Sequence, residues 1–262
     1  MPLKQENAAG DSAAVSGKIV GIFEAMNMAH LADPKIYLGM PMPILVQLHT
    51  VLVRQHEEDK DKRYRNRLKY AGIDKERSSH TFRWDSGHYP SAAQGCIEEA
   101  LSIEFISSQK NLVVIGPPGV GKTLLVTIVV CKAIRGGFSA KYKTAHAIAT
   151  ELHEARDGNS LSGYIKKLSA CDVLAIEDLP YASFDEKGFK DFLAIIDARY
   201  ERKSTFITTN KSFNDWAGET PDITMALAAI GRVAQDAVVI NMNGAKDMRL
   251  AHAMDMLGIV VG

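Results

Sequence analysis

The sequence LVVIGPPGVGKT, from Leu112 to Thr123, decides the fold of this chain. An apolar run rich in β-branched residues leads directly into the spacing G-x-x-x-x-G-K-T, which is typical of a loop that binds nucleotide phosphates. Glycines let such a loop turn its backbone N–H groups toward an anion, because they adopt positive φ angles without strain. The pattern therefore predicts a nucleoside triphosphate site at the start of a helix.

Each residue of this loop receives an expected role. Lys122 can reach the β- and γ-phosphates, and Thr123 can ligate Mg²⁺, so the expected cofactors are ATP and Mg²⁺. The helix that follows presents its positive N-terminal end to the same anion. A Gly-rich turn between two core elements is the structural alternative. The expected nucleotide-binding residues are Gly116, Pro117, Pro118, Gly119, Val120, Gly121, Lys122, Thr123 and Leu124.

Composition limits the possible functions. The 262 residues carry no net charge and 46% of them are apolar, so any affinity for nucleic acid must come from a local basic patch. Cys96, Cys131 and Cys171 lack metal-ligand spacing and are expected to be buried thiols in a reducing compartment. No apolar stretch reaches transmembrane length and no signal-peptide core is visible. We therefore expect a cytoplasmic protein with no membrane partner.

The first 70 residues contain only helical patterns. We expect a disordered first turn or two, a short amphipathic helix ending near Leu31, and a longer helix from Pro43 to about residue 71. The longer helix carries a basic run that we predict to contact DNA phosphates. A solvated face with i,i+4 ion pairs such as Glu58–Lys62 is the alternative. The expected DNA-binding residues are Lys60, Lys62, Arg63, Arg65, Arg67 and Lys69.

Residues 71–95 show no clear periodicity and mark the expected domain boundary. We predict a helical DNA- or partner-binding domain at 1–80, a linker at 81–95 and an ATPase domain at 96–262. Phe82 and Trp84 are expected to pack against the second domain rather than to stack on bases. Beyond residue 96, predicted helices, the first of them at 97–107, alternate with strands at 111–115, 138–143, 172–177, 204–209 and 237–241. This alternation predicts an α/β fold, with a parallel sheet covered on both faces and ligands at the carboxyl ends of its strands.

Polar side chains follow two of the other predicted strands. Glu177 ends the strand at 172–177 and Asp178 follows it, and two carboxylates at this place are costly to bury unless they meet a cation or water. We assign Glu177 to the Mg²⁺ shell with Thr123, and Asp178 to the same metal site and to activation of the attacking water. Asn210 follows the next strand and is expected to bridge the γ-phosphate and that water. Thr-Asn-Lys is also an ordinary turn sequence.

These residues resemble the motifs of AAA+ ATPases, and within that class the IstB-type helper ATPases of transposition and the similar DnaC-type helicase loaders. The match to the IstB pattern is nearly position by position in RYERKSTFITTN (Arg199 to Asn210) and continues with Phe213 and Trp216. The resemblance implies a three-layer P-loop AAA+ fold with a parallel sheet, preceded by a small all-α N-terminal domain.

The resemblance also implies catalytic roles. Glu177 and Asp178 correspond to the Walker B pair, and Asn210 corresponds to sensor 1. Arg232 corresponds to an arginine finger donated to a neighbouring subunit, with a surface arginine as the alternative. Together with Lys122, these are the expected catalytic residues of a Mg²⁺-dependent ATPase.

Two departures from the family pattern qualify this reading. The usual Walker B order is Asp then Glu, so the expected base, Asp178, is one methylene shorter and we predict slow hydrolysis with intact ATP binding. About 20 residues follow the last predicted strand. They are too few for the helical lid that carries sensor 2 in larger AAA+ proteins, although Arg249 matches an arginine of the IstB pattern.

The function implied by the resemblance is an ATP-dependent helper of transposition. Such a protein assembles with other copies of itself on double-stranded DNA and delivers that DNA to a transposase. The alternatives are a DnaC-like replicative helicase loader and an ATP-gated DNA-binding scaffold with little hydrolysis. A small-molecule kinase is disfavoured because nothing resembles an arginine-rich lid.

Overall fold

The structure is a computed structural model that describes residues 3–74, 89–179, 184–212, 215, 222–245 and 247, with side chains from residue 12 onward. The chain divides into two compact units, one ending at Arg65 and the other beginning at Asn66. The division falls inside α2, Met42–Ala71. Most of the linker expected at 81–95, with Phe82 and Trp84, lies outside the described residues.

The first unit is helical, as expected. It contains α1 (Leu3–Ala25), two short 3-10 helices, η1 (Ala29–Leu31) and η2 (Pro34–Tyr37), and α2 as far as Arg65. α1 begins at Leu3 and so includes the first turns that we expected to be disordered. The core consists of Ile19, Phe23, Tyr37 and Leu45.

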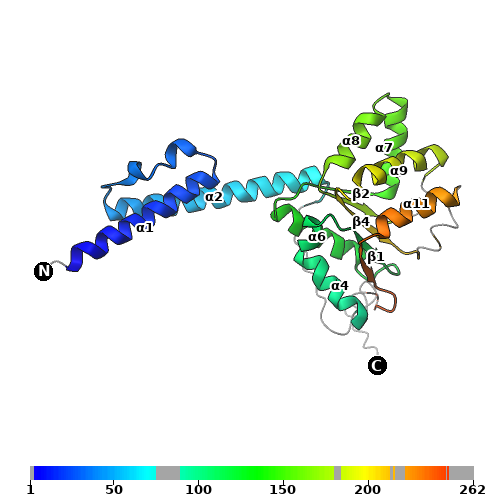
Figure 1. Ribbon diagram of the computed structural model, residues 1–262, viewed down its shortest axis with the longest axis horizontal. Helices are drawn as coiled ribbons and strands as arrows, with labels where there is room; N and C mark the ends of the chain where they lie inside the picture. Colours follow the sequence, from blue (N-terminus) through cyan, green and yellow to red (C-terminus); the bar gives the residue numbers. More distant parts are fainter. Residues whose placement is uncertain are drawn as a thin grey trace, which may run out of the picture. The chain divides into compact units, whose positions relative to one another are not determined.

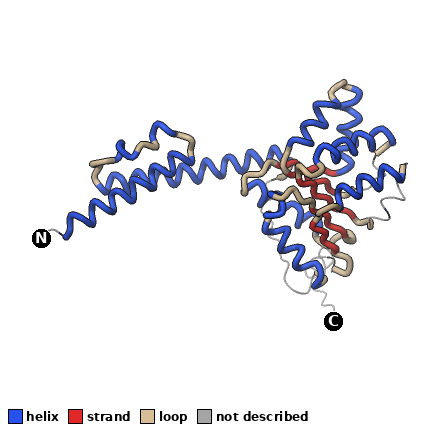
Figure 2. Tube along the Cα trace, in the orientation of Figure 1, coloured by secondary structure: helices blue, strands red, loops and turns tan. Residues whose placement is uncertain are grey.

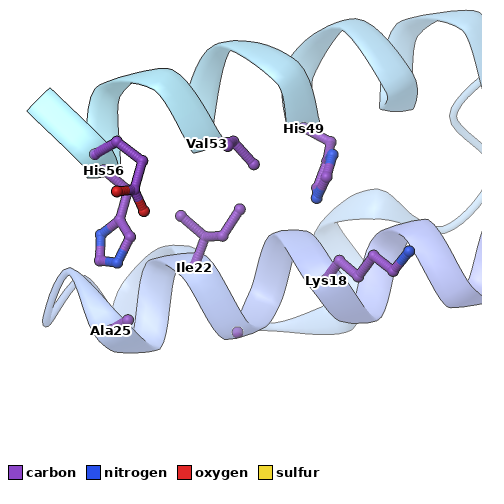
Figure 3. A pocket seen from close by; sticks show the side chains of 8 residues that line it. Lys18, Ile22, Ala25, His49, Val53 and His56 are labelled. Atoms are coloured by element: carbon purple, nitrogen blue, oxygen red, sulfur yellow. The ribbon is translucent and has the colours of Figure 1, made fainter. Parts of the chain in front are cut away.

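A groove runs between α1 and α2 within this unit. In Figure 3, Ile22 and Ala25 of α1 lie opposite His49, Val53 and His56 of α2. The groove has a volume of about 360 Å³. Its walls are mostly apolar.

The second unit is built on a five-stranded sheet with the strand order β2-β3-β4-β1-β5, in which all four pairings are parallel. Leu112 pairs with both Phe206 and Val238, so the phosphate-loop strand lies between its two partners in direct register. These pairings confirm the predicted parallel sheet, whose strands are drawn in red in Figure 2. The strands are β1 (Leu112–Ile115), β2 (Ala140–Thr144), β3 (Val173–Glu177), β4 (Ser204–Thr209) and β5 (Val238–Asn241).

Helices cover both faces of the sheet and make three layers (Figure 1). One face packs against α7 (Ala145–Asp157), α8 (Leu161–Ala170), α9 (Glu186–Arg199) and α11 (Ile223–Ala234). The other face carries α4 (Ser91–Ser102), α5 (Glu104–Ser107) and α6 (Lys122–Arg135). None of the helices in the described part of the chain is long and apolar enough to cross a membrane.

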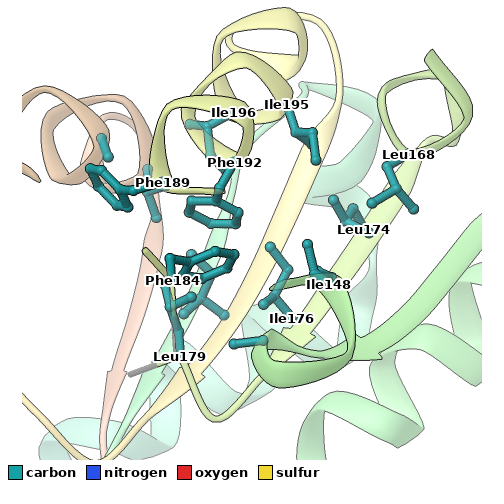
Figure 4. Close-up of a cluster of buried hydrophobic side chains, with 14 of the residues drawn as sticks. Ile148, Leu168, Leu174, Ile176, Leu179, Phe184, Phe189, Phe192, Ile195 and Ile196 are labelled. Carbon is teal, nitrogen blue, oxygen red and sulfur yellow. The ribbon is translucent and has the colours of Figure 1, made fainter. Parts of the chain in front are cut away.

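The alternation of side chains along β3 determines where its acidic residue lies. Leu174 and Ile176 belong to the aromatic and aliphatic core beneath α7, α8 and α9 (Figure 4). Successive side chains of a strand point to opposite faces. Glu177 is therefore directed toward the α6 face, where the phosphate-loop helix begins.

Arg199 joins three elements at the amino edge of the sheet. Its side chain is 1% exposed. The guanidinium donates to the carbonyl oxygens of Leu168 and Cys171, both at 2.8 Å, to that of Ser204 at 2.5 Å, and to Thr205 Oγ1 at 3.0 Å. The carbonyls near the end of α8 have no partner within their helix, so Arg199 caps α8 and fixes it to β4.

Candidate nucleotide-binding site

The loop after β1 has the backbone shape that the glycine pattern predicts. Gly119 and Gly121 adopt φ angles of +86° and +94°, a region that residues with a Cβ rarely enter. Lys122 starts α6, and the N–H of Leu125 closes the first helical turn on the Gly121 carbonyl at 2.9 Å. The loop therefore ends at the N-terminus of a long helix, which attracts anions.

The first three residues of the loop supply shape rather than hydrogen-bond donors. The Gly116 N–H donates to the Thr209 carbonyl at 3.1 Å, and Pro117 and Pro118 have no N–H. A Cβ at Gly116 would lie 2.8 Å from the Met242 Cβ, so only glycine fits beside the chain that leaves β5. The backbone N–H groups able to face a phosphate therefore begin at Gly119.

The two polar residues that start α6 are held by neighbouring groups. Lys122 is 7% exposed, and its ammonium donates to the carbonyls of Gly116 at 2.8 Å and Pro117 at 2.9 Å. The Thr123 hydroxyl donates to Glu177 Oε1. The predicted proximity of the phosphate loop and the acidic strand end is thus present. The hydroxyl and carboxylate oxygens fit Mg²⁺, which is commonly bound by one or two carboxylates together with substrate phosphates.

Glu177 and Asp178 have different surroundings. Glu177 is 8% exposed, whereas Asp178 is exposed and has a left-handed backbone with φ +49°. The Asp178 N–H donates to Thr208 Oγ1 at 3.0 Å, and the next N–H, of Leu179, donates to the Thr208 carbonyl at 3.0 Å. Thr208 therefore fixes the turn that places Asp178 at the solvent-facing edge of the site.

Asn210 lies at the same edge of the sheet. It follows Thr209, which pairs with Ile115, the last residue before the phosphate loop. Its side chain is exposed, and so is accessible to a ligand in the loop. Leu124 is half-buried in the first turn of α6.

Arg232 lies near the amino ends of the strands, on the side of the sheet opposite the phosphate loop. The Asn111 amide, immediately before β1, donates to the Arg232 carbonyl at 3.2 Å, so the end of α11 is at the amino edge of the sheet. Gly116 is five residues further along, roughly 16 Å for an extended strand. The Arg232 guanidinium forms an ion pair with Asp197 at 2.8 Å. The structure does not bring Arg232 to the phosphate loop of its own chain.

The six basic residues of α2 between Lys60 and Lys69 are all exposed. Lys60 forms an ion pair with Glu57 at 3.0 Å, and the Arg67 guanidinium donates to the Gly137 carbonyl at 3.2 Å. Lys62, Arg63, Arg65 and Lys69 complete this basic surface.

Besides Met242, two residues outside every sequence motif contact the loop. The Tyr89 hydroxyl donates to the Val120 carbonyl at 3.2 Å, and burial raises the pKa of Tyr89 to about 12, so it stays a donor at neutral pH. The Asp247 carboxylate lies against Gly119. Neither residue belongs to a local motif, so only the three-dimensional structure reveals these contacts.

Comparison with known proteins agrees with this geometry. A family model described as IstB-like ATP binding protein matches residues 40–255. The chain belongs to this family. It is 30% identical over 155 residues to an ATP-binding protein of insertion sequence IS5376 from Geobacillus stearothermophilus, covering 59% of this chain and 62% of that protein. It is 32% identical over 161 residues to the corresponding protein of IS232 from Bacillus thuringiensis subsp. berliner, covering 62% and 64%. The chain thus spans less than two thirds of these curated relatives.

Solved structures support the fold of this IstB-like chain. DnaI aligns with a TM-score of 0.55 at 19% identity, over 65% of this chain and 94% of that one. AMPPCP-bound DnaA from Aquifex aeolicus aligns with a TM-score of 0.53 at 17% identity, over 68% and 55%. The P-loop AAA+ fold, with a helical region before it, is confirmed.

Proposed function

We propose that this IstB-like chain is a Mg²⁺-dependent ATPase that assembles on duplex DNA and delivers that DNA to a transposase. The observation that carries the proposal is the meeting of Lys122, the hydrogen-bonded pair Thr123–Glu177, and Asp178 at one edge of the sheet. The names of the relatives, which place them in insertion sequences, support the link to transposition.

The proposed chemistry assigns a task to each residue. Bound Mg²⁺ would neutralise charge on the phosphates. Thr123 and Glu177 would hold the metal, with Asp178 next to Glu177 as a further carboxylate. Lys122 would exchange its carbonyl partners for phosphate oxygens. Asp178 would orient and deprotonate the attacking water, and Asn210 would hold that water against the γ-phosphate.

Arg232 would act in a neighbouring copy of the chain. Its position at the amino edge supports a role between subunits, since it is far from its own loop. In that role the guanidinium would leave Asp197 and stabilise transition-state charge on the neighbour's nucleotide.

The six basic residues of α2 between Lys60 and Lys69 would bind DNA phosphates without reading sequence. Replacing Arg63 and Arg67 together with alanine should weaken binding to every duplex and lower the slope of log affinity against log salt by about 2. Replacing Lys35 and Arg202, two exposed basic residues outside this run, is the control. Equal losses in both double variants would contradict a localised binding surface.

ATP hydrolysis measured without DNA, with duplex DNA and with single-stranded DNA tests the proposal. Lys122→Ala is the blank, and Asp178→Asn should bind ATP but lose hydrolysis. Stimulation by duplex supports the transposition helper. Preference for single strands would favour a helicase loader, and ATP binding without hydrolysis would favour an ATP-gated scaffold.

A further inference from the structure

We propose that Asp247 competes with nucleotide phosphates for the loop, so that ATP binding must displace the turn that carries it. This inference rests on the proposed nucleotide site. It adds a residue that regulates access to that site.

The chain after β5 is held at the base of the phosphate loop. The Met242 N–H donates to the Ile115 carbonyl at 2.7 Å, and the Met242 side chain is fully buried beside Gly116. Gly244 then takes φ +86°, and the Ala245 N–H bonds back to the Met242 carbonyl at 3.0 Å. This tight turn comes just before Asp247, whose carboxylate lies against Gly119.

The Asp247 carboxylate occupies the space that a side chain at position 119 would need. A Cβ on Gly119 would lie 2.3 Å from one Asp247 oxygen and 2.5 Å from the other. Contact is possible because residue 119 is a glycine. The carboxylate lies at the first loop residue whose N–H is available to a phosphate.

The phosphate loop at Gly119 attracts a carboxylate and a phosphate for the same reason. Both are anions, and the backbone N–H groups and positive helix end of the loop favour either. Both cannot occupy it together, because like charges a few ångströms apart repel strongly. Nucleotide affinity should therefore include the free energy needed to move Asp247 away.

The test is the affinity for ATP of the wild type and of Asp247→Asn, which keeps the side-chain shape but removes the charge. We expect Asp247→Asn to bind ATP about tenfold more tightly. Asp236→Asn is the matched control, since it removes one charge from an exposed residue in the turn before β5, at the amino edge of the sheet. It should bind ATP like the wild type.

The outcomes separate this inference from the proposed function. Equal or weaker binding by Asp247→Asn would overturn the inference alone, and weaker binding would mean that Asp247 contacts the bound nucleotide or its metal. Absence of ATP binding by both proteins would refute the nucleotide site itself. Hydrogen exchange gives a second measurement. Adding ATP to the wild type should speed exchange at the Ala245 N–H, and unchanged or slower exchange would contradict displacement of the turn.

Discussion

Arg199 is a cation whose hydrogen bonds go mainly to backbone carbonyls. Burial lowers the pKa of Arg199, but the ring of carbonyl oxygens stabilises its charge. Lysine cannot replace the planar guanidinium group of Arg199, because a single ammonium group cannot reach the carbonyls of α8 and β4 together.

We expect Arg199→Lys to lower the free energy of unfolding by about 3 kcal/mol, since several buried carbonyls lose their partners. Urea denaturation measures the change. Arg202→Lys, at an exposed position three residues later, should change stability by less than about 0.5 kcal/mol. Similar changes in the free energy of unfolding for both variants would show that the buried hydrogen bonds of Arg199 contribute little to stability.

Thr208 is expected to position Asp178 for catalysis. Thr208→Val keeps the shape of the side chain but removes the acceptor of the Asp178 N–H, which leaves a left-handed backbone unsupported. We expect kcat for ATP hydrolysis to fall about tenfold with little change in ATP affinity. Thr208→Ser retains the hydroxyl and should keep most of the activity. Equal loss of ATP binding in both variants would indicate general disruption.

Local motifs predicted the residues that lie on consecutive stretches of chain. The phosphate loop and the acidic strand end were recognisable because their chemistry requires specific residues at fixed spacing. The contacts of Tyr89, Met242 and Asp247 with the loop could not be predicted. They depend on tertiary packing between segments more than 25 residues apart along the chain.

At the scale of elements, Asp172 ties together the amino ends of three strands. Its carboxylate accepts from Ser139, which precedes β2, through the N–H at 2.9 Å and the hydroxyl at 2.7 Å. It also accepts from Lys203, which precedes β4, at 2.5 Å. Partial burial raises the pKa of Asp172, but the hydrogen bonds from Lys203 and Ser139 outweigh burial and lower the pKa to about 2.

This pKa predicts how acid affects stability. A carboxyl group with a lowered pKa in the folded state stabilises the fold above its unfolded pKa of about 4, and that stabilisation is lost as the pH falls toward 2. Asp172→Asn should therefore be less stable at pH 6, and its stability should change less between pH 4 and pH 2. Chemical denaturation across this range measures both. Parallel pH curves for the two proteins would contradict the prediction.

Strands were easier to predict than helix ends. The strands begin and end within two residues of their predicted bounds. In β3 and β4 every residue is buried, as expected for strands inside a parallel sheet with both faces covered. The helix predicted at 97–107 is instead two helices separated at Ile103, which has φ +61°. No glycine marks this break. Apolar spacing alone did not predict the left-handed residue.

For the whole molecule, the proposed action of Arg232 between subunits can be tested by mixing variants. Lys122→Ala and Arg232→Ala should each be inactive in ATP hydrolysis. A mixture should recover part of the activity, because an intact loop in one chain then meets an intact arginine in its neighbour. Activity no greater than that of the separate variants would argue against a shared site. A mixture of Lys122→Ala with Asp178→Asn controls for simple averaging.

The alternation of helical and strand patterns along the sequence predicted the order of the elements. It also predicted that the site lies at the carboxyl ends of the strands. The domain boundaries expected at residues 80 and 95 stay predictions. The compact units meet within a continuous helix, where apolar spacing shows no interruption.

The consecutive prolines of the phosphate loop have a consequence in terms of chain entropy. Neither Pro117 nor Pro118 needs an N–H, since the loop donors begin at Gly119, so both positions tolerate a ring that fixes φ. Each ring restricts the unfolded chain and the empty loop alike. The backbone of the phosphate loop is therefore partly ordered before a nucleotide binds. A more flexible loop would bind nucleotide more weakly even if it made the same contacts.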